Sequence, residues 1–299
     1  NNIADTARFI VMYPQGTPNT IGQNAWNNGT LLASTSDDIA FINALIDNAI
    51  NFHNVDPTRI YVTGFSMGGI MSYHLACALN DRIAAIASMS GTMSTDDIAN
   101  CVPSYKTPVM HLHGTADATV PYDSGALPSL SLVPETMAFW EGVHTCAANP
   151  DSTQLPDTAN DGITVDRFVW TGCTPNESLE LWRMNNADHI YMYEPVNDFT
   201  EANEIWRFFM KWSHPSPAPA STSELSETST VHIFPNPAKT TITVSSQSSI
   251  EVSILDVNGK VCISQEVKTG ETSIDVSNLD AGVYLLQGSN GYAERLVIQ

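Results

Sequence analysis

Positive charge is scarce in this sequence. Its 299 residues include 12 lysines and arginines against 32 aspartates and glutamates, a net charge of −20. Such an acidic protein repels phosphate backbones and anionic lipids, which argues against nucleic acid and acidic membrane surfaces as partners. Long apolar runs are also missing, and no stretch reaches the length that a membrane-spanning helix needs. The composition is compatible with a neutral or cationic substrate or with an insoluble polymer.

Cysteines are few, and their positions predict two disulfide bonds. Of the five, Cys77 and Cys101 form one pair and Cys146 and Cys173 another, and each pair flanks a short connection that a disulfide can close. Cys262 is left alone in the C-terminal region. This pairing indicates folding in an oxidising compartment, with five buried thiols as the alternative.

Metal-binding spacings are absent as well. No Cys/His spacing typical of a metal site occurs. The stretch Asp157–Gly162 contains acids, but an ordinary turn explains it better than a calcium loop. We therefore predict no metal and no other cofactor.

The stretch Thr63–Gly69 contains the pattern Gly-x-Ser-x-Gly. Ile60–Val62 before it is β-branched and aromatic, as in a buried strand, and Ile70–Leu79 after it has helical spacing. A serine on such a tight turn has strained backbone angles, and side chains at the flanking glycines would collide with the adjoining strand or helix. Ser66 is thus the predicted nucleophile, with a plain Gly/Ser turn as the alternative.

Apolar runs alternate with helical patterns over the first two thirds of the chain. Each predicted strand is apolar throughout, which is typical of a mainly parallel sheet in an α/β domain, covered by helices on both faces. The predicted strands are Arg8–Pro14, Ile60–Thr63, Arg82–Gly91, Pro108–Gly114, Ile163–Trp170 and Ser178–Met184. The predicted helices begin at Ser36, Ile70, Val133 and Asp198, and Asp198 with Glu201 has the spacing of a capping box.

The character of the chain changes after residue 213. Residues 214–229 are rich in proline, serine and threonine and lack apolar periodicity, which predicts a linker. Residues 230–299 alternate apolar and polar side chains in short runs, which predicts a small all-β sandwich. The predicted division is therefore an α/β domain over residues 1–213, the linker, and the sandwich.

A serine nucleophile needs a base, and the base needs an acid that fixes its tautomer. Asp117 lies just past the carboxyl end of a predicted strand, at the rim where open α/β sheets place their sites. Asp123, Asp96 and Asp97 are weaker candidates, because surface solvation explains the polar stretches around them. Asp117 is the predicted acid.

His189 is the predicted base. It lies in the loop between the last strand and the last helix of the first domain, and the order Ser66, Asp117, His189 is that of α/β-hydrolases. The other histidines considered precede the acid, adjoin a predicted disulfide cysteine, or lie in or near the linker: His111, His113, His144, His214 and His232.

Three motifs of the first domain occur in register: Gly64–Gly69, Gly114–Asp117 followed by Val120–Tyr122, and the loop that carries His189. Together they resemble the secreted esterases of the polyhydroxybutyrate depolymerase and feruloyl esterase group. The resemblance covers residues 1–213 and implies an α/β-hydrolase that cleaves carboxylic esters through an acyl-enzyme.

The same resemblance implies a role for each site residue. Ser66 attacks the ester, His189 moves the proton and Asp117 orients the histidine. The backbone N–H of Met67 stabilises the oxyanion.

Two aromatic residues are candidate substrate contacts. Trp26 stands in a loop rich in glycine, asparagine and threonine, as a packing anchor or as a substrate platform. The esterase group often continues its histidine loop with tryptophan and proline, whereas this chain has Ile190 and Tyr191. We therefore expect the acyl site to differ in shape, with Tyr191 near it.

The C-terminal region contains Phe234–Pro237, Ile254–Lys260 and Leu279–Leu285. These segments resemble the type A sorting domain of the type IX secretion system. The resemblance implies secretion or display at the surface of a Bacteroidetes-type bacterium, with the secretion machinery as a partner. A carbohydrate-binding sandwich is the alternative.

No His-Gly motif lies upstream of Ser66. In α/β-hydrolases such a loop usually supplies the second oxyanion donor. The chain also begins without a methionine or a signal peptide, so we expect an N-terminally truncated sheet or a processed end. We expect Arg8–Pro14 to be displaced toward Ile60–Thr63 or separated from it by a gap, and catalysis to be slow.

The leading functional prediction is a secreted serine esterase that acts on a polyester or on feruloyl or acetyl esters of plant cell walls. A catalytically silent surface or binding protein with a hydrolase-like fold is one alternative. A serine peptidase of the same fold is another, because ester and peptide hydrolysis use the same triad.

Overall fold

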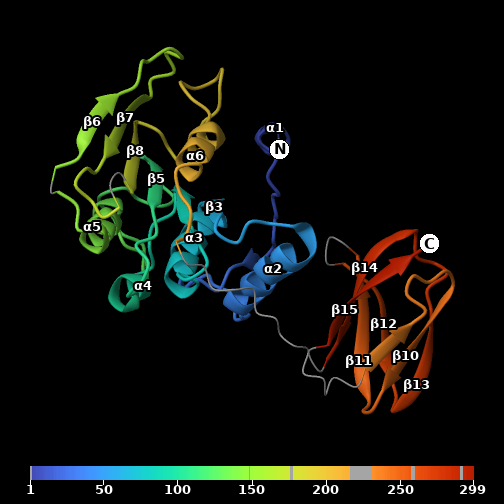
Figure 1. Cartoon of the computed structure of the whole chain (residues 1–299). Helices are drawn as coiled ribbons and strands as arrows, with labels where there is room; N and C mark the ends of the chain where they lie inside the picture. Colours follow the sequence, from blue (N-terminus) through green and yellow to red (C-terminus); the bar gives the residue numbers. More distant parts are fainter. Residues whose placement is uncertain (1, 148, 176–177, 216–230, 257–259, 290–291) are drawn as a thin grey trace. The chain divides into compact units, whose positions relative to one another are not determined.

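The computed structural model describes residues 2–147, 149–175, 178–215, 231–256, 260–289 and 292–299 (Figure 1). The chain separates into two compact units, Asn1–Ser221 and Thr222–Gln299. The predicted linker lies outside the described residues apart from positions 214 and 215, so its boundaries stay a prediction.

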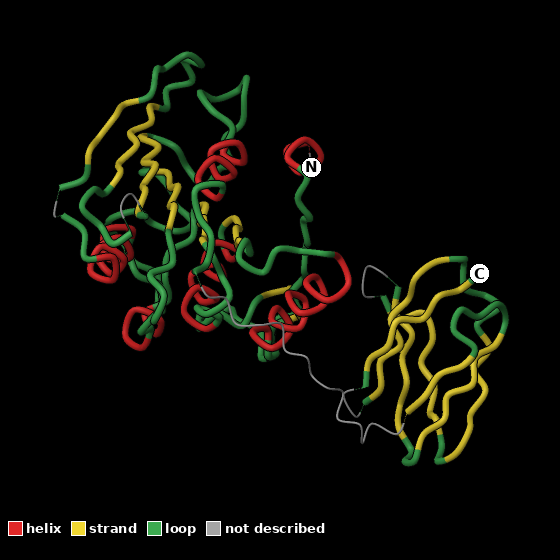
Figure 2. Tube along the Cα trace, viewed as in Figure 1, coloured by secondary structure: helices red, strands yellow, loops and turns green. Residues whose placement is uncertain are grey.

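A six-stranded sheet forms the centre of the first unit (Figure 2). Its strands, in spatial order, are β3 (Tyr61–Phe65), β4 (Ala85–Met89), β5 (Val109–Gly114), β8 (Leu179–Asn185), β7 (Thr164–Val169) and β6 (Asp151–Gln154). The first four run parallel and the last two pair antiparallel. The predicted, mainly parallel sheet is therefore confirmed.

Two apolar cores lie on the two faces of this sheet. Ile86 of β4 belongs to a core with α2 (Asp38–His53), α3 (Met67–Ala78) and α5 (Val133–His144), whereas its neighbours Ala85 and Ala87 belong to a core with α6 (Glu201–Phe209). Successive side chains of a strand point to opposite faces, so helices cover both faces. The remaining elements are α1 (Asn2–Ala7), β1 (Thr17–Pro18), β2 (Asn24–Ala25) and α4 (Thr95–Asn100).

The prediction of a strand at Arg8–Pro14 is wrong. The segment belongs to no helix or strand, and the side chains from Ile10 to Tyr13 are exposed, with Tyr13 77% accessible. β3 is consequently an edge strand, and a groove of about 1410 Å³ lies between it and the segment. Apolar, β-branched sequence does not make a strand without a neighbour to complete its hydrogen bonds. Of the two arrangements expected, the structure has the separation.

The predicted capping box of α6 is also wrong. Thr200 is the residue at the helix N-cap, and no side chain caps the helix. Oδ1 of Asp198 instead accepts the backbone N–H groups of Thr158 and Ala159. Tertiary contact with another loop has taken the carboxylate away from the local role that its spacing predicts.

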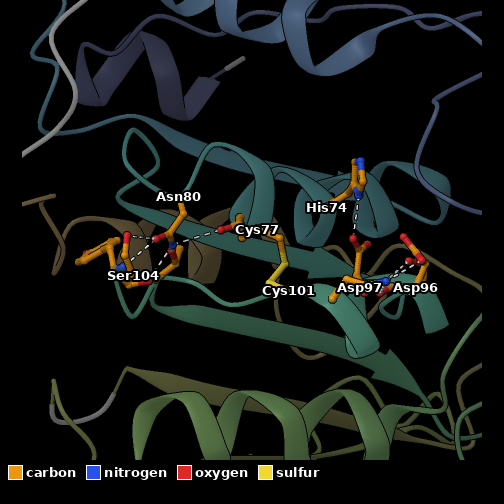
Figure 3. Close-up of a disulfide and its surroundings, with 12 residues drawn as sticks. His74, Cys77, Asn80, Asp96, Asp97, Cys101 and Ser104 are labelled. Carbon is orange, nitrogen blue, oxygen red and sulfur yellow. Dashed lines mark hydrogen bonds and ion pairs between the residues drawn. A yellow bond between two sulfur atoms is a disulfide. The ribbon is translucent and has the colours of Figure 1, made fainter.

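Both predicted disulfide bonds are confirmed. Cys77 of α3 is bonded to Cys101, and Cys146 is bonded to Cys173. Figure 3 shows the first of these bonds, with the hydrogen-bonded pair His74 and Asp97 nearby. The bond and the pair both fasten α3 to α4.

In the described part of the second unit, seven strands form two antiparallel sheets with a shared apolar core. One sheet has the order β13-β10-β9 and the other β12-β11-β14-β15. The predicted all-β sandwich is therefore confirmed, although residues 257–259 of the Ile254–Lys260 motif lie outside the described residues. The strands are β9 (Val231–Phe234), β10 (Thr241–Ser246), β11 (Ile250–Leu255), β12 (Val261–Val267), β13 (Gly270–Asp275), β14 (Gly282–Gly288) and β15 (Ala293–Ile298).

No helix in the described ranges is long and apolar enough to cross a membrane.

Removing the Cys146–Cys173 disulfide should destabilise the first unit. The bond spans 27 residues, and closing a loop of this size contributes about 3 to 4 kcal/mol in the chain-entropy model. We expect the double variant Cys146→Ser/Cys173→Ser to lose about that much free energy of unfolding in urea. Tryptophan fluorescence is the measurement, since all six tryptophans precede residue 214.

The matched control is Cys262→Ser, because Cys262 is free and exposed. We expect it to change stability by no more than about 0.5 kcal/mol. Labelling of both Cys146 and Cys173 by a thiol reagent in unreduced protein would contradict the prediction.

The buried carboxyl group of Glu201 should make the first unit less stable as the pH rises. Its Oε1 accepts the N–H of Met192 at 3.2 Å, and Oε2 has no hydrogen-bond partner within the described part of the chain. Burial raises the pKa of Glu201 to about 8, against the smaller opposing effect of the Met192 hydrogen bond.

This folded-state pKa exceeds the unfolded value. The stabilisation from proton binding is therefore complete below the unfolded pKa of about 4.5 and is lost as the pH rises through about 8. Glu201→Gln removes the titration. Between about pH 5 and 8, the free energy of unfolding of the wild type should fall. In the variant we expect this fall to be smaller by at least about 1 kcal/mol. Parallel pH profiles in urea denaturation would show the idea to be wrong.

Candidate active site

Ser66 occupies a strained turn between β3 and α3. Its backbone has φ 55° and ψ −118°, a region that L-residues with side chains rarely adopt. Its N–H donates to the carbonyl oxygen of Met89 at the end of β4, at 2.7 Å. The turn is thus fixed to the neighbouring strand, with the serine at the carboxyl edge of the sheet.

Close packing around this turn explains two of its three glycines. A Cβ atom on Gly64 would lie 2.4 Å from a backbone atom of Gly68, and one on Gly69 would lie 2.4 Å from Oγ of Ser88. A Cβ on Gly68 would have no atom within 4 Å. The predicted collision is therefore wrong for Gly68, because this residue faces the groove beside β3.

Asp117 is buried in the turn that follows β5. Its Oδ1 accepts the backbone N–H groups of Thr119 and Val120, and its Oδ2 lies 2.7 Å from Nδ1 of His189. Burial alone would raise the pKa of Asp117. Hydrogen bonds from His113, His189 and Val120 outweigh it and hold the pKa well below the ordinary value. The carboxylate is therefore charged at neutral pH.

His189 lies in the loop after β8, between the acid and the nucleophile turn. Gly114 allows this loop to approach, since a Cβ there would lie 2.3 Å from the carbonyl oxygen of Ala187. The His189 ring is 4.7 Å, centroid to centroid, from the ring of Phe65, which directly precedes Ser66. The structure thus brings the three predicted residues to one edge of the sheet.

The tautomer of His189 follows from its partner. A carboxylate only accepts hydrogen bonds, so Nδ1 of His189 carries a proton and donates to Asp117. Nε2 of His189 can then accept a hydrogen bond. The described residues show no hydrogen bond between Ser66 Oγ and this ring. Such catalytic hydrogen bonds are often long before substrate binds.

Met67 stands at the head of α3, where backbone N–H groups have no partner within the helix. This position suits the predicted oxyanion donor. A pocket of about 210 Å³ adjoins it, lined by Met67, Trp26 and Gln15 among others. Tyr191 does not line this pocket. It lines the large groove, which Trp26 also borders, and its hydroxyl accepts the N–H of Ala202.

The alternative acids and bases have other partners. His144 is buried with its ring nitrogens near the carbonyl oxygen of Thr107 and the hydroxyl of Ser178, and burial lowers its pKa to about 4. Asp97 pairs with His74. Neither alternative contacts Ser66 or Asp117 among the described contacts.

Sequence reasoning missed a second histidine at the acid. Nε2 of His113 lies 3.3 Å from Oδ2 of Asp117. The order of the three residues in the chain excludes His113 as the base, because His113 precedes the acid. The available signal was the spacing of His111 and His113, which places two polar rings on one face of an otherwise apolar strand.

No group of three or more histidine, cysteine, aspartate or glutamate side chains suited to a metal occurs in the described residues.

Two family models match this chain. The family model described as Phospholipase/Carboxylesterase matches residues 27–132, and the model described as Secretion system C-terminal sorting domain matches residues 232–299. The chain is 35% identical to feruloyl esterase C of Emericella nidulans over 199 residues, and 31% identical to probable feruloyl esterase C of Aspergillus niger over 198 residues. These alignments cover 66% of this chain and 66% of each relative.

A longer relative is the bifunctional acetylxylan esterase/xylanase XynS20E of Neocallimastix patriciarum. It is 26% identical over 221 residues, which are 73% of this chain and 29% of that protein. The chain therefore spans less than a third of this relative's length.

The two glycines that follow Ser66 should respond differently to alanine. In Gly69→Ala the new Cβ meets Ser88 Oγ, and we expect a loss of about 1 to 3 kcal/mol of stability. Gly68→Ala adds a methyl group in open space and gains helix propensity, so we expect it to be neutral or to stabilise by up to about 1 kcal/mol. Urea denaturation measures both, and equal losses would contradict the open space beside Gly68.

Proposed function

Residues 27–132 of this chain belong to the phospholipase/carboxylesterase family and residues 232–299 form a secretion sorting domain, and from this premise we propose that the first unit hydrolyses carboxylic esters with Ser66 as its nucleophile. The sorting domain indicates a secreted or cell-surface protein. An α/β-hydrolase fold carries this family's chemistry at the end of the nucleophile strand.

The proposed reaction has two halves. Oγ of Ser66 attacks the ester carbonyl while its proton passes to Nε2 of His189, and Asp117 stabilises the imidazolium that results. The tetrahedral intermediate collapses to an acyl-enzyme, and the alcohol leaves with the proton from His189. Water then attacks the acyl group by the same route, which releases the acid and restores Ser66.

One observation carries the proposal. The His189 ring is held 2.7 Å from Asp117 on one side and against Phe65, the residue before the nucleophile, on the other. Phe65 ends β3, and Asp117 and His189 follow β5 and β8, which run parallel to it and end at the same edge. A plain structural turn at Ser66 would require none of this convergence.

The substrate class proposed is an acetyl or feruloyl ester on plant cell-wall polysaccharide. The names of the relatives support it, as acetylxylan and feruloyl esterases recur among them. The pocket of about 210 Å³ beside Met67 is the proposed site for the substrate group that borders the ester, with Trp26 as its aromatic wall. Location outside the cell suits a polymer that does not enter it.

A silent, hydrolase-like binding protein is the second candidate. Among the described residues we assign one oxyanion donor, the N–H of Met67, whereas such holes use two. Lack of one donor slows turnover by about 100- to 1000-fold, or roughly 3 to 4 kcal/mol. We therefore propose slow but real turnover of simple esters.

The decisive experiment measures hydrolysis of p-nitrophenyl acetate together with covalent labelling by a fluorophosphonate. We expect hydrolysis and labelling in the full chain, loss of both in Ser66→Ala, and a fall of at least about 100-fold in His189→Ala. His144→Gln is the matched histidine control, since His144 is buried away from the site, and should keep its activity. Neither hydrolysis nor labelling in the wild type would favour the silent protein.

Trp26→Ala tests the substrate pocket. We expect it to raise KM for methyl ferulate or acetylated xylan at least about threefold more than for p-nitrophenyl acetate, because the smaller ester makes fewer contacts with the wall. A polyhydroxybutyrate film belongs in the same screen. Equal effects on all substrates would assign Trp26 to packing alone.

A further inference from the structure

A chain of three buried side chains ends at Asp117. The hydroxyl of Tyr73, from α3, lies 2.7 Å from Nδ1 of His111, and Nε2 of His111 lies 3.1 Å from Nδ1 of His113. Nε2 of His113 lies 2.7 Å from the carbonyl oxygen of Val120 and 3.3 Å from Oδ2 of Asp117. Tyr73, His111 and His113 have no accessible surface.

The proton positions along this chain follow from its last acceptor. A carbonyl oxygen only accepts, so His113 carries a proton on Nε2. The hydroxyl of Tyr73 donates to Nδ1 of His111, so the proton of His111 lies on Nε2 and is donated to Nδ1 of His113. Each group in the chain donates toward the carboxylate.

The opposite direction leaves a buried donor unpaired. If Nδ1 of His111 carried the proton, the hydroxyl proton of Tyr73 would have no acceptor among the described residues, and His113 would be a cation. Burial and the neighbouring His113 lower the pKa of His111 well below its ordinary value, so His111 is neutral. Burial raises the pKa of Tyr73, which therefore keeps its proton.

His113 and His189 approach the same oxygen of Asp117. The Nε2–H of His113 offsets part of the negative charge at Oδ2 of Asp117. Less of that charge is then available to stabilise protonated His189. The donors behind it polarise one another in the same direction. The Val120 loop, whose N–H also binds Asp117, is fixed by the same ring.

We propose that His113, oriented by His111 and Tyr73, is a positioning residue that fixes Asp117 and limits how strongly this carboxylate stabilises protonated His189. The inference rests on the proposed function, in which His189 is the base. It assigns a task to three polar side chains that would otherwise be a costly feature of an apolar core.

Other charged and titratable groups face this region and must be kept unchanged in a test. Asp188 accepts the backbone N–H of His189, and Asp117 stands opposite its ring. The Tyr122 ring packs edge-on against His113, and burial raises the pKa of Tyr122, so that it is neutral. None of these groups is altered by the variants below.

The experiment compares His113→Leu, His113→Gln and Tyr73→Phe with the wild type and with His144→Gln. The readout is the pH dependence of fluorophosphonate labelling and of kcat/KM for p-nitrophenyl acetate. In His113→Leu, we expect the midpoint of the acid limb to rise by about 0.5 to 1 pH unit, because Oδ2 then serves His189 alone. Tyr73→Phe should shift it in the same direction by less.

His113→Gln should rescue the midpoint to within about 0.2 pH unit, since its amide N–H can reach the oxygen atoms that Nε2 reaches. His144→Gln removes an equally buried histidine whose partners, Thr107 and Ser178, precede β5 and β8, whereas Asp117 follows the end of β5. It should leave the midpoint in place. An unchanged midpoint in folded His113→Leu would overturn the inference.

A second measurement needs no activity and applies if His113→Leu does not fold. Imidazole ¹⁵N–¹H NMR of the full chain should show His111 and His113 neutral, each with its proton on Nε2. In Tyr73→Phe, the His189 Nδ1–H resonance should move, and in His144→Gln it should not. A proton on Nδ1 of His111, or a His189 signal indifferent to Tyr73→Phe, contradicts the proposal.

Different results would contradict the proposed function and the inference about His113. Hydrolysis that survives Ser66→Ala would overturn the proposed function, whereas the NMR result would still decide whether the chain of donors exists. Loss of activity in Ser66→Ala together with an unchanged acid limb in folded His113→Leu would overturn this inference alone.

Discussion

The backbone of Ser66 cannot keep its conformation without the sheet and helix around it. A positive φ at a residue with a side chain costs about 1 to 3 kcal/mol, and the surrounding contacts must impose it. Its N–H is bound by Met89, its carbonyl oxygen accepts from the first turn of α3, and a Cβ on Gly91 would lie 2.4 Å from that oxygen. The close approach of β4 and α3 to one turn is therefore the constraint on which the site depends.

The acid and base reach this turn through backbone contacts of the same kind. Gly114 ends β5 and lets the loop before His189 settle directly on the strand. Two backbone N–H groups hold Oδ1 of Asp117, which leaves Oδ2 for the two histidines. Since the loops are tied to parallel strands, the rigidity of the sheet sets the positions of Asp117 and His189 relative to Ser66.

The outer edge of β3 contrasts with this packed interior. The groove beside it borders Gly68 and Tyr191, and exposed apolar side chains such as Ile10 and Tyr13 line its far side. An open edge next to a nucleophile strand leaves one flank of the site without hydrogen-bonded support. Ser66, Asp117 and His189 are supported from the β4 and β5 side, where apolar side chains of both cores are buried.

Elements with local sequence signals could be predicted without the structure. The glycine pattern around Ser66, the apolar strands β4, β5 and β8, the cysteine spacings and the alternating C-terminal strands each predict structure from neighbours in the chain, and each is confirmed. The positions of Asp117 and His189 followed from their places after strands.

Features that depend on a partner far along the chain could not be predicted, because folding alone brings the two partners together. Arg8–Pro14 has a strand-like sequence, but no neighbouring strand completes its hydrogen bonds. Asp198 satisfies another loop in place of the α6 N-terminus. The chain of donors behind Asp117 joins Tyr73 of α3 to two residues of β5, 38 residues and more along the chain, and no local pattern encodes that meeting. Packing, which brings distant polar atoms into one dry interior and requires that they pair, was the deciding cause.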